Sequence, residues 1–400
     1  MLPAYIPYGA YWSTPFARWQ GSFASLHALG FAAWVARREL AARGIDAAQL
    51  DHGVLGTTVP QHHSFYGLPW VAAMLGAPHL AGPTVAQACA TSARCLAEAA
   101  AEVVGGAGSV LVVTADRTSN GPHVYYPDPQ APGGTGAQEN WVIDNFGFDP
   151  YAEVAMISCG ENAAVRFGID TQAQHDWVLH LYAKYDAARA DGAAFLRRFM
   201  TLPFDVPDRL LRRVALHLDG DEGIRATTAE GLARLRPLLA GGSITHGGQT
   251  HPADGNAGMI VTDADHVRDF SARPEIAIRM CGVGQSRVDK AMMPLAPVPA
   301  AAAALARAGI AASDLVAVKT HNPFAVNDLI LMRELAISPD ILNNNGCSLV
   351  WGHPQGPTGL RAIIELIEEL VARGGGHGLF TGCAAGDTGM AVVLHVGDAA

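Results

Sequence analysis

The chain has 400 residues, half of them hydrophobic, with a formal net charge of −10. This composition supplies a large buried core and predicts a folded globular protein. Basic residues are outnumbered by acidic ones, and aromatic residues make up only 7% of the chain, so we expect no nucleic-acid partner. The N-terminus lacks a basic stretch followed by an apolar one, and no uncharged apolar run reaches the roughly 18 residues of a membrane span. We therefore expect a cytoplasmic protein that does not enter a membrane.

The cysteines are spread along the chain without a Cys-x-x-Cys pair, which predicts reduced thiols and no metal site. Burial is expected for most of them, because free cysteine behaves as a small apolar residue. The six are Cys89, Cys95, Cys159, Cys281, Cys347 and Cys383.

An internal repeat appears when the predicted elements are taken in chain order. Residues 39–57 are typical of a helix that ends at a glycine, then a short turn, then a strand. Residues 304–323 repeat this plan, and five residues recur at a constant spacing of 265: Leu40, Gly44, Ile45, Ala47 and Leu50 return as Leu305, Gly309, Ile310, Ala312 and Leu315.

The repeat continues in 89–116 and 352–386, which share the order entrance residue, helix, glycine turn and apolar strand. Two halves of similar build are therefore predicted, each with helices packed on a mostly parallel sheet. We expect an N-terminal half that begins with 1–116, a loop insertion over 117–250 whose start and end also contribute to the N-terminal half, and a C-terminal half over 251–400.

The predicted insertion begins with a segment rich in Gly and Pro, 120–141, which is interpreted as a long functional loop. Helical spacing of apolar residues follows over 161–192. We expect this insertion to cover the core.

Cys89 stands at the entrance of a predicted helix, where free amides and the helix dipole favour a thiolate. The matching entrance in the second half holds His353. A pseudo-twofold arrangement would bring these two residues together, and a cysteine facing a histidine is a common form of activated nucleophile. Cys383 and His321 follow predicted strands directly, so all four side chains are expected to line one crevice.

Five motifs in the same order resemble those of the thiolase family. Residues 343–361, NNNGCSLVWGHPQGPTGLR, are similar to the family's Gly-His-Pro signature, and CAAGDTG, 383–389, is similar to its terminal Cys-x-Gly motif. QACATSARCLAEAA resembles the segment around the family's nucleophile. Weaker matches cover ISCGENAAVRFGI and residues 221–258.

The resemblance implies a duplicated five-layer αβαβα fold and a coenzyme-A-dependent acyltransferase. Cys89 would carry the acyl group, His353 would accept its proton, and Cys383 would act as acid and base at the α-carbon. Backbone N–H groups of Cys89 and Ala385 would form one oxyanion hole, and His353 with a water the other.

The same resemblance implies that coenzyme A and acyl-CoA are the partners, with no permanently bound cofactor. Arg225 would contact the nucleotide end of coenzyme A, and Thr250 would lie near its pantetheine arm. A homodimer paired through a sheet edge of the first half, or a tetramer, is also implied.

Two departures from the family pattern leave alternatives open. His321-Asn322-Pro323-Phe324 replaces the usual Asn-Glu-Ala-Phe and is closer to the sterol-carrier-type thiolases, so His321 is expected to position the catalytic water. Ala385 adds a methyl group beside the reacting atoms. A ketoacyl synthase-like condensing enzyme is the second interpretation, supported by His321 and Asn322, and a non-catalytic acyl-CoA binding protein is the third.

Overall fold

The computed structural model describes residues 3–399 and contains a six-stranded sheet built mainly from the first part of the chain. Its strand order is β1-β10-β5-β3-β4, with β2 beside β10. The strands β3, β4 and β5 are parallel, and β10 runs antiparallel to β5 and β1. The strands are β1 (Tyr11–Ser13), β2 (Ala17–Arg18), β3 (His52–Gly56), β4 (Thr84–Val85), β5 (Ser109–Arg117) and β10 (Ala253–Thr262).

A second sheet repeats the central arrangement of the first. Its order is β11-β14-β13-β12, with β12 and β13 parallel and β14 antiparallel to β13 and β11. The predicted duplication is confirmed, because the order β12, β13, β14 and β11 across this sheet repeats the order β3, β5, β10 and β1 across the first. The prediction of mostly parallel sheets is wrong, because β14 and β10 each pair antiparallel with both of their main neighbours. The strands are β11 (Ile276–Arg287), β12 (Leu315–His321), β13 (Gly376–Ala384) and β14 (Thr388–Asp398).

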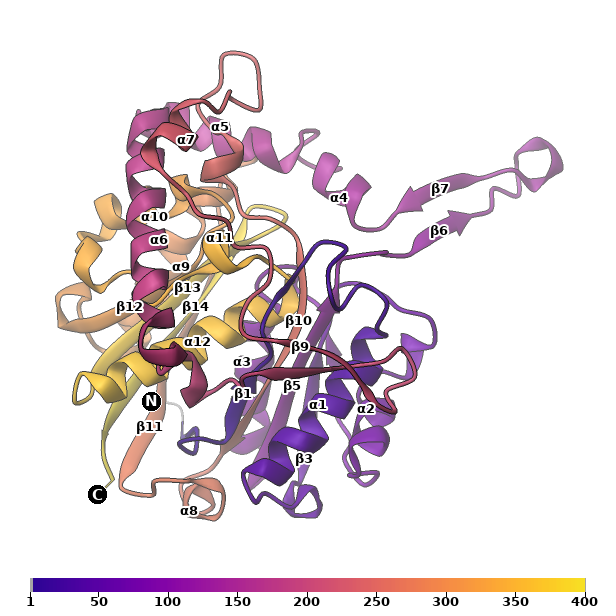
Figure 1. The fold of residues 1–400 in the computed structure, drawn as a ribbon, viewed down its shortest axis with the longest axis vertical. Coiled ribbons are helices and arrows are strands. Elements are labelled where there is room, and N and C mark those ends of the chain that lie inside the picture. Colours follow the sequence, from indigo (N-terminus) through magenta and orange to yellow (C-terminus); the bar gives the residue numbers. More distant parts are fainter. Residues whose placement is uncertain (1–2, 400) are drawn as a thin grey trace.

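Helices complete five layers, as predicted (Figure 1). The pair α3 (Thr91–Val104) and α12 (Gly356–Ala372) lies between the sheets, α1 (Ala28–Ala42) and α2 (Leu68–Leu75) cover the outer face of the first sheet, and α9 (Pro297–Ala308) covers the outer face of the second. Next to α9 lies α10 (Ala325–Leu335). The short helices α8 (Val267–Phe270) and α11 (Ser348–Trp351) occupy connections.

The boundary of the first sheet differs from the predicted one. β10 begins after residue 250 and therefore falls in the predicted C-terminal half, yet it pairs with β5 over nine residues, from Asp254 to Thr262. Its apolar residues fit the first core, because they lie between β1 and β5. The first sheet thus reaches residue 262.

The middle part of the chain contains regular structure that the loop prediction missed. Within 120–141, β6 (His123–Tyr126) and β7 (Ala137–Asn140) form an antiparallel hairpin, and the Gly- and Pro-rich residues lie in its turn. The β-forming side chains of Val124, Tyr125 and Tyr126 explain the strand. Beyond it come α4 (Ile143–Gly147), α5 (Met156–Phe167), α6 (Thr171–Ala193), β8 (Phe204–Pro207), β9 (Val214–Leu218) and α7 (Ala229–Ala233).

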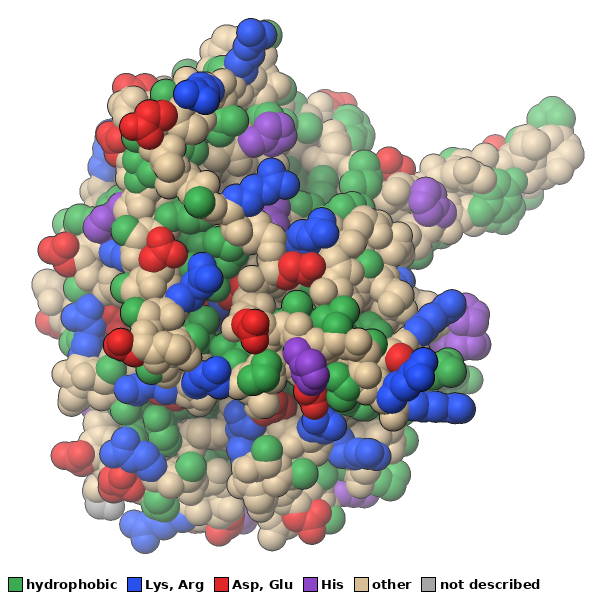
Figure 2. All heavy atoms as spheres, viewed as in Figure 1, with side chains coloured by type: hydrophobic (Ala, Val, Ile, Leu, Met, Phe, Trp, Pro, Cys, Tyr) green, Lys and Arg blue, Asp and Glu red, His purple; other side chains and the backbone are tan. Residues whose placement is uncertain are grey.

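The β6–β7 hairpin projects from the body of the molecule as an arm (Figure 2). Tyr125 and Tyr126 on this arm are about half exposed, at 50% and 47%. On the face drawn in Figure 2, acidic and basic side chains are interspersed. Across residues 3–399, the structure has no helix with the length and apolar character needed to cross a bilayer.

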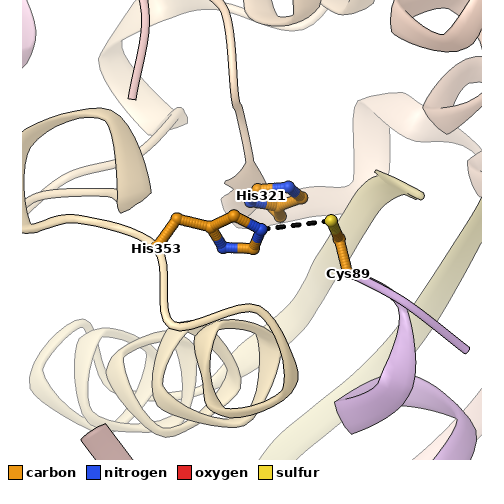
Figure 3. A group of neighbouring side chains, drawn as sticks. All are labelled: Cys89, His321 and His353. Carbon is orange, nitrogen blue, oxygen red and sulfur yellow. Dashed lines mark hydrogen bonds between the residues drawn. The ribbon is translucent and has the colours of Figure 1, made fainter. Parts of the chain in front are cut away.

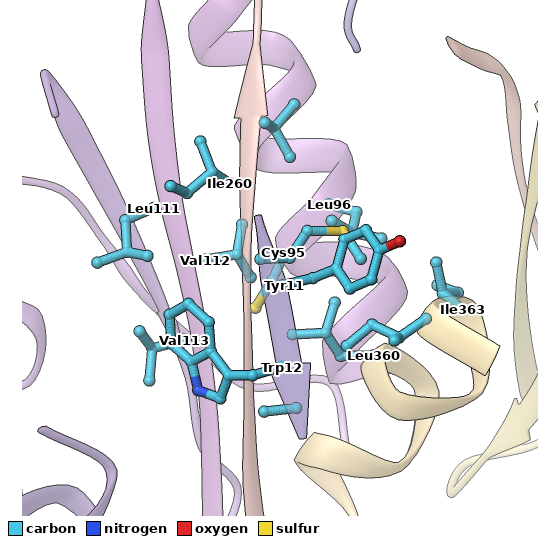
Figure 4. Packing of buried hydrophobic residues seen from close by; sticks show 14 of the residues in the cluster. Tyr11, Trp12, Cys95, Leu96, Leu111, Val112, Val113, Ile260, Leu360 and Ile363 are labelled. Carbon is cyan, nitrogen blue, oxygen red and sulfur yellow. The ribbon is translucent and has the colours of Figure 1, made fainter. Parts of the chain in front are cut away.

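The two halves meet through α3 and α12 (Figure 4). The buried face of α3 is rich in alanine, including Ala93, Ala99 and Ala100. Small side chains let α12 approach closely, and Leu360 and Ile363 of α12 fill the space beside α3. This contact brings the N-terminal ends of both helices to one region.

A close helix–sheet contact in the second half predicts a sensitive glycine. A Cβ atom at Gly284, in β11, would lie 2.0 Å from the carbonyl oxygen of Ala300 in α9. This oxygen belongs to the backbone of a packed helix and Gly284 lies in a packed strand, so neither can move aside easily. We therefore expect Gly284→Ala to lower the free energy of unfolding by about 3 kcal/mol, measured by urea denaturation. The control is Gly220→Ala, where a Cβ meets nothing within 4 Å and the change should stay within about 0.5 kcal/mol. Equal effects of the two changes would contradict this account.

Candidate active site

Cys89 lies in a tight turn between β4 and α3. The turn requires Ala88 to adopt a left-handed backbone with φ of 43°. It is held by the Thr91 hydroxyl, which accepts from the Gln87 amide at 2.8 Å and donates to the Ala88 carbonyl at 2.7 Å. Cys89 is therefore fixed two residues before the first residue of α3, with 7% of its surface exposed.

His353 approaches Cys89 from the other half of the molecule. Its Nε2 lies 3.1 Å from the sulfur of Cys89, as the dashed line in Figure 3 marks. On the other side of the ring, Nδ1 lies 2.6 Å from the hydroxyl of Thr358. A proton on Nδ1 that is donated to Thr358 leaves the Nε2 lone pair free to accept the thiol proton. The predicted meeting of the two helix entrances is confirmed.

The backbone before His353 also has a defined conformation. Gly352 has φ of 93°, and a Cβ there would lie 2.8 Å from the Cβ of Ala253. The His353 amide donates to the carbonyl oxygen of His251 at 2.9 Å. These two contacts with the chain at the start of β10 thus fix the backbone from which the imidazole of His353 extends.

His321, the last residue of β12, stacks on His353 (Figure 3). The ring centroids are 4.0 Å apart and the planes differ by 21°. Its Nδ1 lies 3.1 Å from the hydroxyl of Ser348, whereas its Nε2 is buried without a hydrogen-bond partner. Because the Ser348 hydroxyl donates to the side-chain oxygen of Asn322 at 2.9 Å, it accepts from Nδ1–H of His321, and the buried Nε2 carries a lone pair that can accept from a water.

The donor atoms of Cys89, His321 and His353 all lie within 4.8 Å of one another, a set that matches metal-ligand chemistry. A metal ion, however, must lie in the plane of each imidazole that binds it. The two stacked rings are nearly parallel, so their lone pairs do not converge on one point. This geometry favours hydrogen bonding over metal binding.

Cys383 is the second thiol of the site and lies near the end of β13. Its sulfur is 3.3 Å from the side-chain amide nitrogen of Asn327, which donates to it. Burial raises the pKa of Cys383 well above its ordinary value, and the neighbouring Cys89 raises it further. The predicted convergence of the two thiols is thus confirmed.

Burial dominates the protonation of the cluster. It raises the pKa of Cys89 to about 12, although the amide N–H groups of Ala385 and of Cys89 itself lower that pKa by hydrogen bonding. Burial also lowers the pKa of His353 well below its ordinary value and that of His321 to about 3. The expectation that the helix entrance would favour a thiolate is wrong, because desolvation outweighs the dipole. At neutral pH the resting pair is a thiol and a neutral imidazole.

Asp116, at the end of β5, was not predicted from the sequence, and it binds backbone amides next to the site. Its carboxylate accepts from the amides of Thr58 at 2.7 Å, Val59 at 3.0 Å and Gly356 at 2.8 Å. Burial raises its pKa to about 6, against the effect of these donors. Gly356 is the first residue of α12, so Asp116 connects the first sheet to the helix that follows His353.

Two cavities adjoin the cluster, and a third adjoins one of these two. The first, of about 730 Å³, contains the predicted Arg225 and Thr250 and is called here the arginine cavity. The second, of about 430 Å³, contains Thr250, Cys89 and His353 and is called the central cavity. The third, of about 440 Å³, contains Cys89 and Ala385 and is called the side cavity. Together they form a path from the exposed Arg225 to the buried thiol and beyond it.

The structure therefore brings five of the seven predicted residues together: Cys89, His353, Cys383, His321 and Ala385. Arg225 and Thr250 lie along the path to them. Thr358 and Asn327 were missed, although Thr358 belongs to the Gly-His-Pro motif, and its hydroxyl five residues after His353 is a usable signal.

Sequence comparison matches the N-terminal domain of thiolases over residues 10–265 and the C-terminal domain of thiolases over residues 274–396. The chain belongs to the thiolase family, and its relatives mark it as an acyltransferase. An acetyl-CoA acetyltransferase of Pseudomonas aeruginosa is 29% identical over 95% of this chain and 96% of that protein. A 3-ketoacyl-CoA thiolase of Idiomarina loihiensis is 30% identical over 81% of each chain.

Solved structures agree with this assignment. The human mitochondrial 3-ketoacyl-CoA thiolase is 25% identical and superposes with a TM-score of 0.89 over 99% of this chain and 100% of that one. Its complex with CoA superposes with a TM-score of 0.88 over 98% of both chains.

The protonation of the pair can be tested by alkylation. Because the pKa of Cys89 is raised to about 12, its thiolate fraction should increase about tenfold per pH unit below that value. We expect the rate of Cys89 alkylation by iodoacetamide, followed by mass spectrometry of the peptide, to rise steadily from acid to alkaline pH. Cys89→Ala provides the control for alkylation of the other thiols. A rate plateau below neutral pH would instead reveal a thiolate–imidazolium pair.

Proposed function

We propose that this protein catalyses the reversible thiolysis of 3-ketoacyl-CoA, or the reverse Claisen condensation, through an acyl-Cys89 intermediate. The observation that carries the proposal is the 3.1 Å contact between the Cys89 sulfur and His353 Nε2 beside a second buried thiol, Cys383. The central and side cavities both include Cys89, and the arginine cavity joins the central cavity at Thr250. A coenzyme A thioester fits such a path, with its nucleotide outside and its reacting carbon at Cys89.

In thiolysis, His353 Nε2 accepts the Cys89 proton as the sulfur bonds to the 3-keto carbon. The bond between C2 and C3 then breaks, which leaves the acyl group on Cys89 and an acetyl-CoA enolate. The Cys383 thiol delivers a proton to C2 of that enolate. The thiol of a second coenzyme A gives its proton to the Cys383 thiolate and attacks the acyl-Cys89 thioester, which releases acyl-CoA, and His353 returns its proton to Cys89.

The neutral resting states of Cys89, His353 and Cys383 suit these steps. A thiol that stays protonated through burial is a proton donor to the enolate carbon, and Asn327 supports the thiolate that remains on Cys383. The decarboxylation of a ketoacyl synthase does not need such a second thiol. The position of Cys383 therefore favours thiolase chemistry over the condensing-enzyme alternative.

Two groups of hydrogen-bond donors match the oxygens that become negative. The amides of Cys89 and Ala385 lie beside the reacting sulfur and serve the tetrahedral intermediates of acyl transfer. His353, protonated by Cys89, serves the thioester oxygen of the enolate, and the Nε2 lone pair of His321 would hold a water that donates its other hydrogen to the same oxygen. His321 thus takes the place of the usual asparagine, as in sterol-carrier-type thiolases.

Coenzyme A would extend from the central cavity into the arginine cavity. Arg225 is exposed there and would meet the phosphates of the nucleotide, while Thr250 lines both cavities and would face the pantetheine arm. A homodimer is also proposed, by pairing of β4 with β4 of a second copy. β4 ends the first sheet with the exposed residue Thr84. Doubling of that dimer to a tetramer, and a cytoplasmic location, stay predictions.

The two thiols should have separable roles. With acetoacetyl-CoA and CoA as substrates, we expect Cys89→Ala to abolish both thiolysis and radiolabelling of the protein by acetyl-CoA. Cys383→Ala should also reduce thiolysis by at least about 100-fold, yet retain the labelling, because acylation needs only Cys89 and His353. Labelling that survives in Cys89→Ala would exclude the acyl-Cys89 intermediate.

The role of His321 is tested by removing the acceptor that would hold the water. We expect His321→Ala to lower kcat for acetoacetyl-CoA thiolysis by roughly 100-fold, the effect of losing the water that serves as one oxyanion-hole donor. His321→Asn, whose side-chain oxygen can accept from the same water, should recover at least about tenfold of this loss. The alkylation rate of Cys89 at fixed pH serves as the control for an intact cluster. Wild-type turnover in His321→Ala would remove this residue from the mechanism.

A further inference from the structure

Asp221 connects its own loop to three other segments of the chain. Its Oδ1 accepts from the backbone amide of Phe16 at 2.7 Å, and its Oδ2 accepts from the hydroxyl of Tyr185 in α6 at 2.7 Å. The guanidinium of Arg361 in α12 donates to both oxygens, to Oδ2 at 2.7 Å. The side chains of Asp221 and Arg361 are fully buried. The carboxylate is therefore fixed in position and in direction.

Arg361 is itself held by further contacts. Its guanidinium lies 4.4 Å from the ring centroid of Trp351 and 4.8 Å from that of Phe16, and its Nε donates to Glu365 at 3.1 Å. The other oxygen of Glu365 accepts from Nζ of Lys319 at 3.0 Å. A buried ion pair adds little stability compared with apolar side chains of similar volume, whereas two-point hydrogen bonding fixes orientation. This network is thus better suited to orienting segments than to stabilising the fold.

The loop that begins at Asp221 carries Arg225 to the arginine cavity. The amide of Glu222 donates to the carbonyl oxygen of Phe16 at 2.8 Å, and the carboxylate of Glu222 accepts from the amide of Ser22 at 2.9 Å. Arg225 follows three residues later and is exposed. Asp221 and Glu222 therefore form the anchor from which the exposed Arg225 extends.

The same contacts relate Arg225 to the active site. α12, which carries Arg361, begins directly after the turn that carries His353. Burial lowers the pKa of His251, while the nearby charge of Asp221 raises that pKa and the charge of Arg225 lowers it. The backbone carbonyl of His251 accepts from the amide of His353. A ligand that reaches from Arg225 to His353 thus spans one connected set of hydrogen-bonded segments.

We propose that Asp221 and Arg361 are positioning residues for coenzyme A, because their buried ion pair fixes the loop of Arg225 relative to α12. Arg225 can then hold the phosphates of the nucleotide end while the thioester carbon lies at Cys89. The inference rests on the proposed thiolase function and on the proposed phosphate contact of Arg225. Neither Asp221 nor Arg361 lines the arginine, central or side cavity, so both act through the loop.

The test compares substrates with and without the nucleotide end. The full-length enzyme is assayed with acetoacetyl-CoA and CoA, and separately with S-acetoacetyl-N-acetylcysteamine and N-acetylcysteamine, which retain only the end of the pantetheine arm. Arg361→Lys keeps the buried charge but loses the two-point contact with Asp221. We expect it to lower kcat/KM for acetoacetyl-CoA by about tenfold, mainly through KM, which is the effect of weakening one contact to a charged group. The truncated pair should stay within about twofold.

A second variant and a matched control accompany this change. Asp221→Asn should act in the same direction, and near-UV circular dichroism checks its fold, because it leaves a buried cation unpaired. The control is Arg43→Lys. Arg43 also pairs with a carboxylate, that of Glu39, and lies over an aromatic ring, that of Trp12, but it does not line the arginine cavity. It should change neither substrate pair by more than about twofold.

A double variant shows whether the ion pair acts through Arg225. Arg225→Ala should lower kcat/KM for acetoacetyl-CoA by about tenfold, and the addition of Arg361→Lys should lower it further by no more than about twofold. Additive losses would overturn the inference and leave the thiolase function intact. Equal losses for the two substrate pairs, or wild-type KM for acetoacetyl-CoA in Arg361→Lys, would do the same.

Binding of CoA separates this inference from the proposed function. Absence of thiolysis with both substrate pairs in the wild-type enzyme would overturn the proposed function. The Kd of CoA, measured by calorimetry, then decides the positioning role: a rise of about tenfold in Arg361→Lys would support it, and an unchanged Kd would overturn it.

Discussion

The interaction on which the site depends is the hydrogen bonding of one buried carboxylate, Asp116, to both halves of the molecule. Asp116 ends the buried part of β5 and accepts from Thr58 and Val59 in its own half and from the Gly356 amide at the start of α12 in the other half. A Cβ at residue 356 would lie 2.7 Å from a carboxylate oxygen, so the contact requires glycine at that position. Through this contact the start of α12, which follows the turn that carries His353, is held against β5 and residues 58 and 59 of the first half, and the Ser92 hydroxyl near the start of α3 donates to the Gly356 carbonyl.

Burial then determines the protonation states of Cys89 and His353. The same low exposure that raises the pKa of Cys89 lowers the pKa of His353, so neither member of the pair is charged at rest. Charge develops only when a thioester is present to receive the sulfur. The amide donor at Ala385 is fixed in place beforehand, and a preorganised donor costs no rearrangement when the charge appears.

The sequence was sufficient to predict the plan of the fold and the main contact of the site. The repeat at a spacing of 265 residues predicts two equal halves, and the equivalence of the two helix entrances predicts the Cys89–His353 contact. The β6–β7 hairpin was missed because its Gly- and Pro-rich turn hides two short strands. The sign of the Cys89 pKa shift was also missed, because desolvation depends on how the halves pack. Asp116 and Asn327 act across long distances in sequence, and no local pattern marks such partners.

The duplication described above also bears on when the site exists during folding. Cys89 belongs to the first half, whereas His321, His353 and Cys383 belong to the second, and each half has its own sheet. A chain in which one half alone has folded holds either a lone thiol or the histidines without their partner. Reactivity is consequently a property of the completed protein, in which α3 and α12 are packed together.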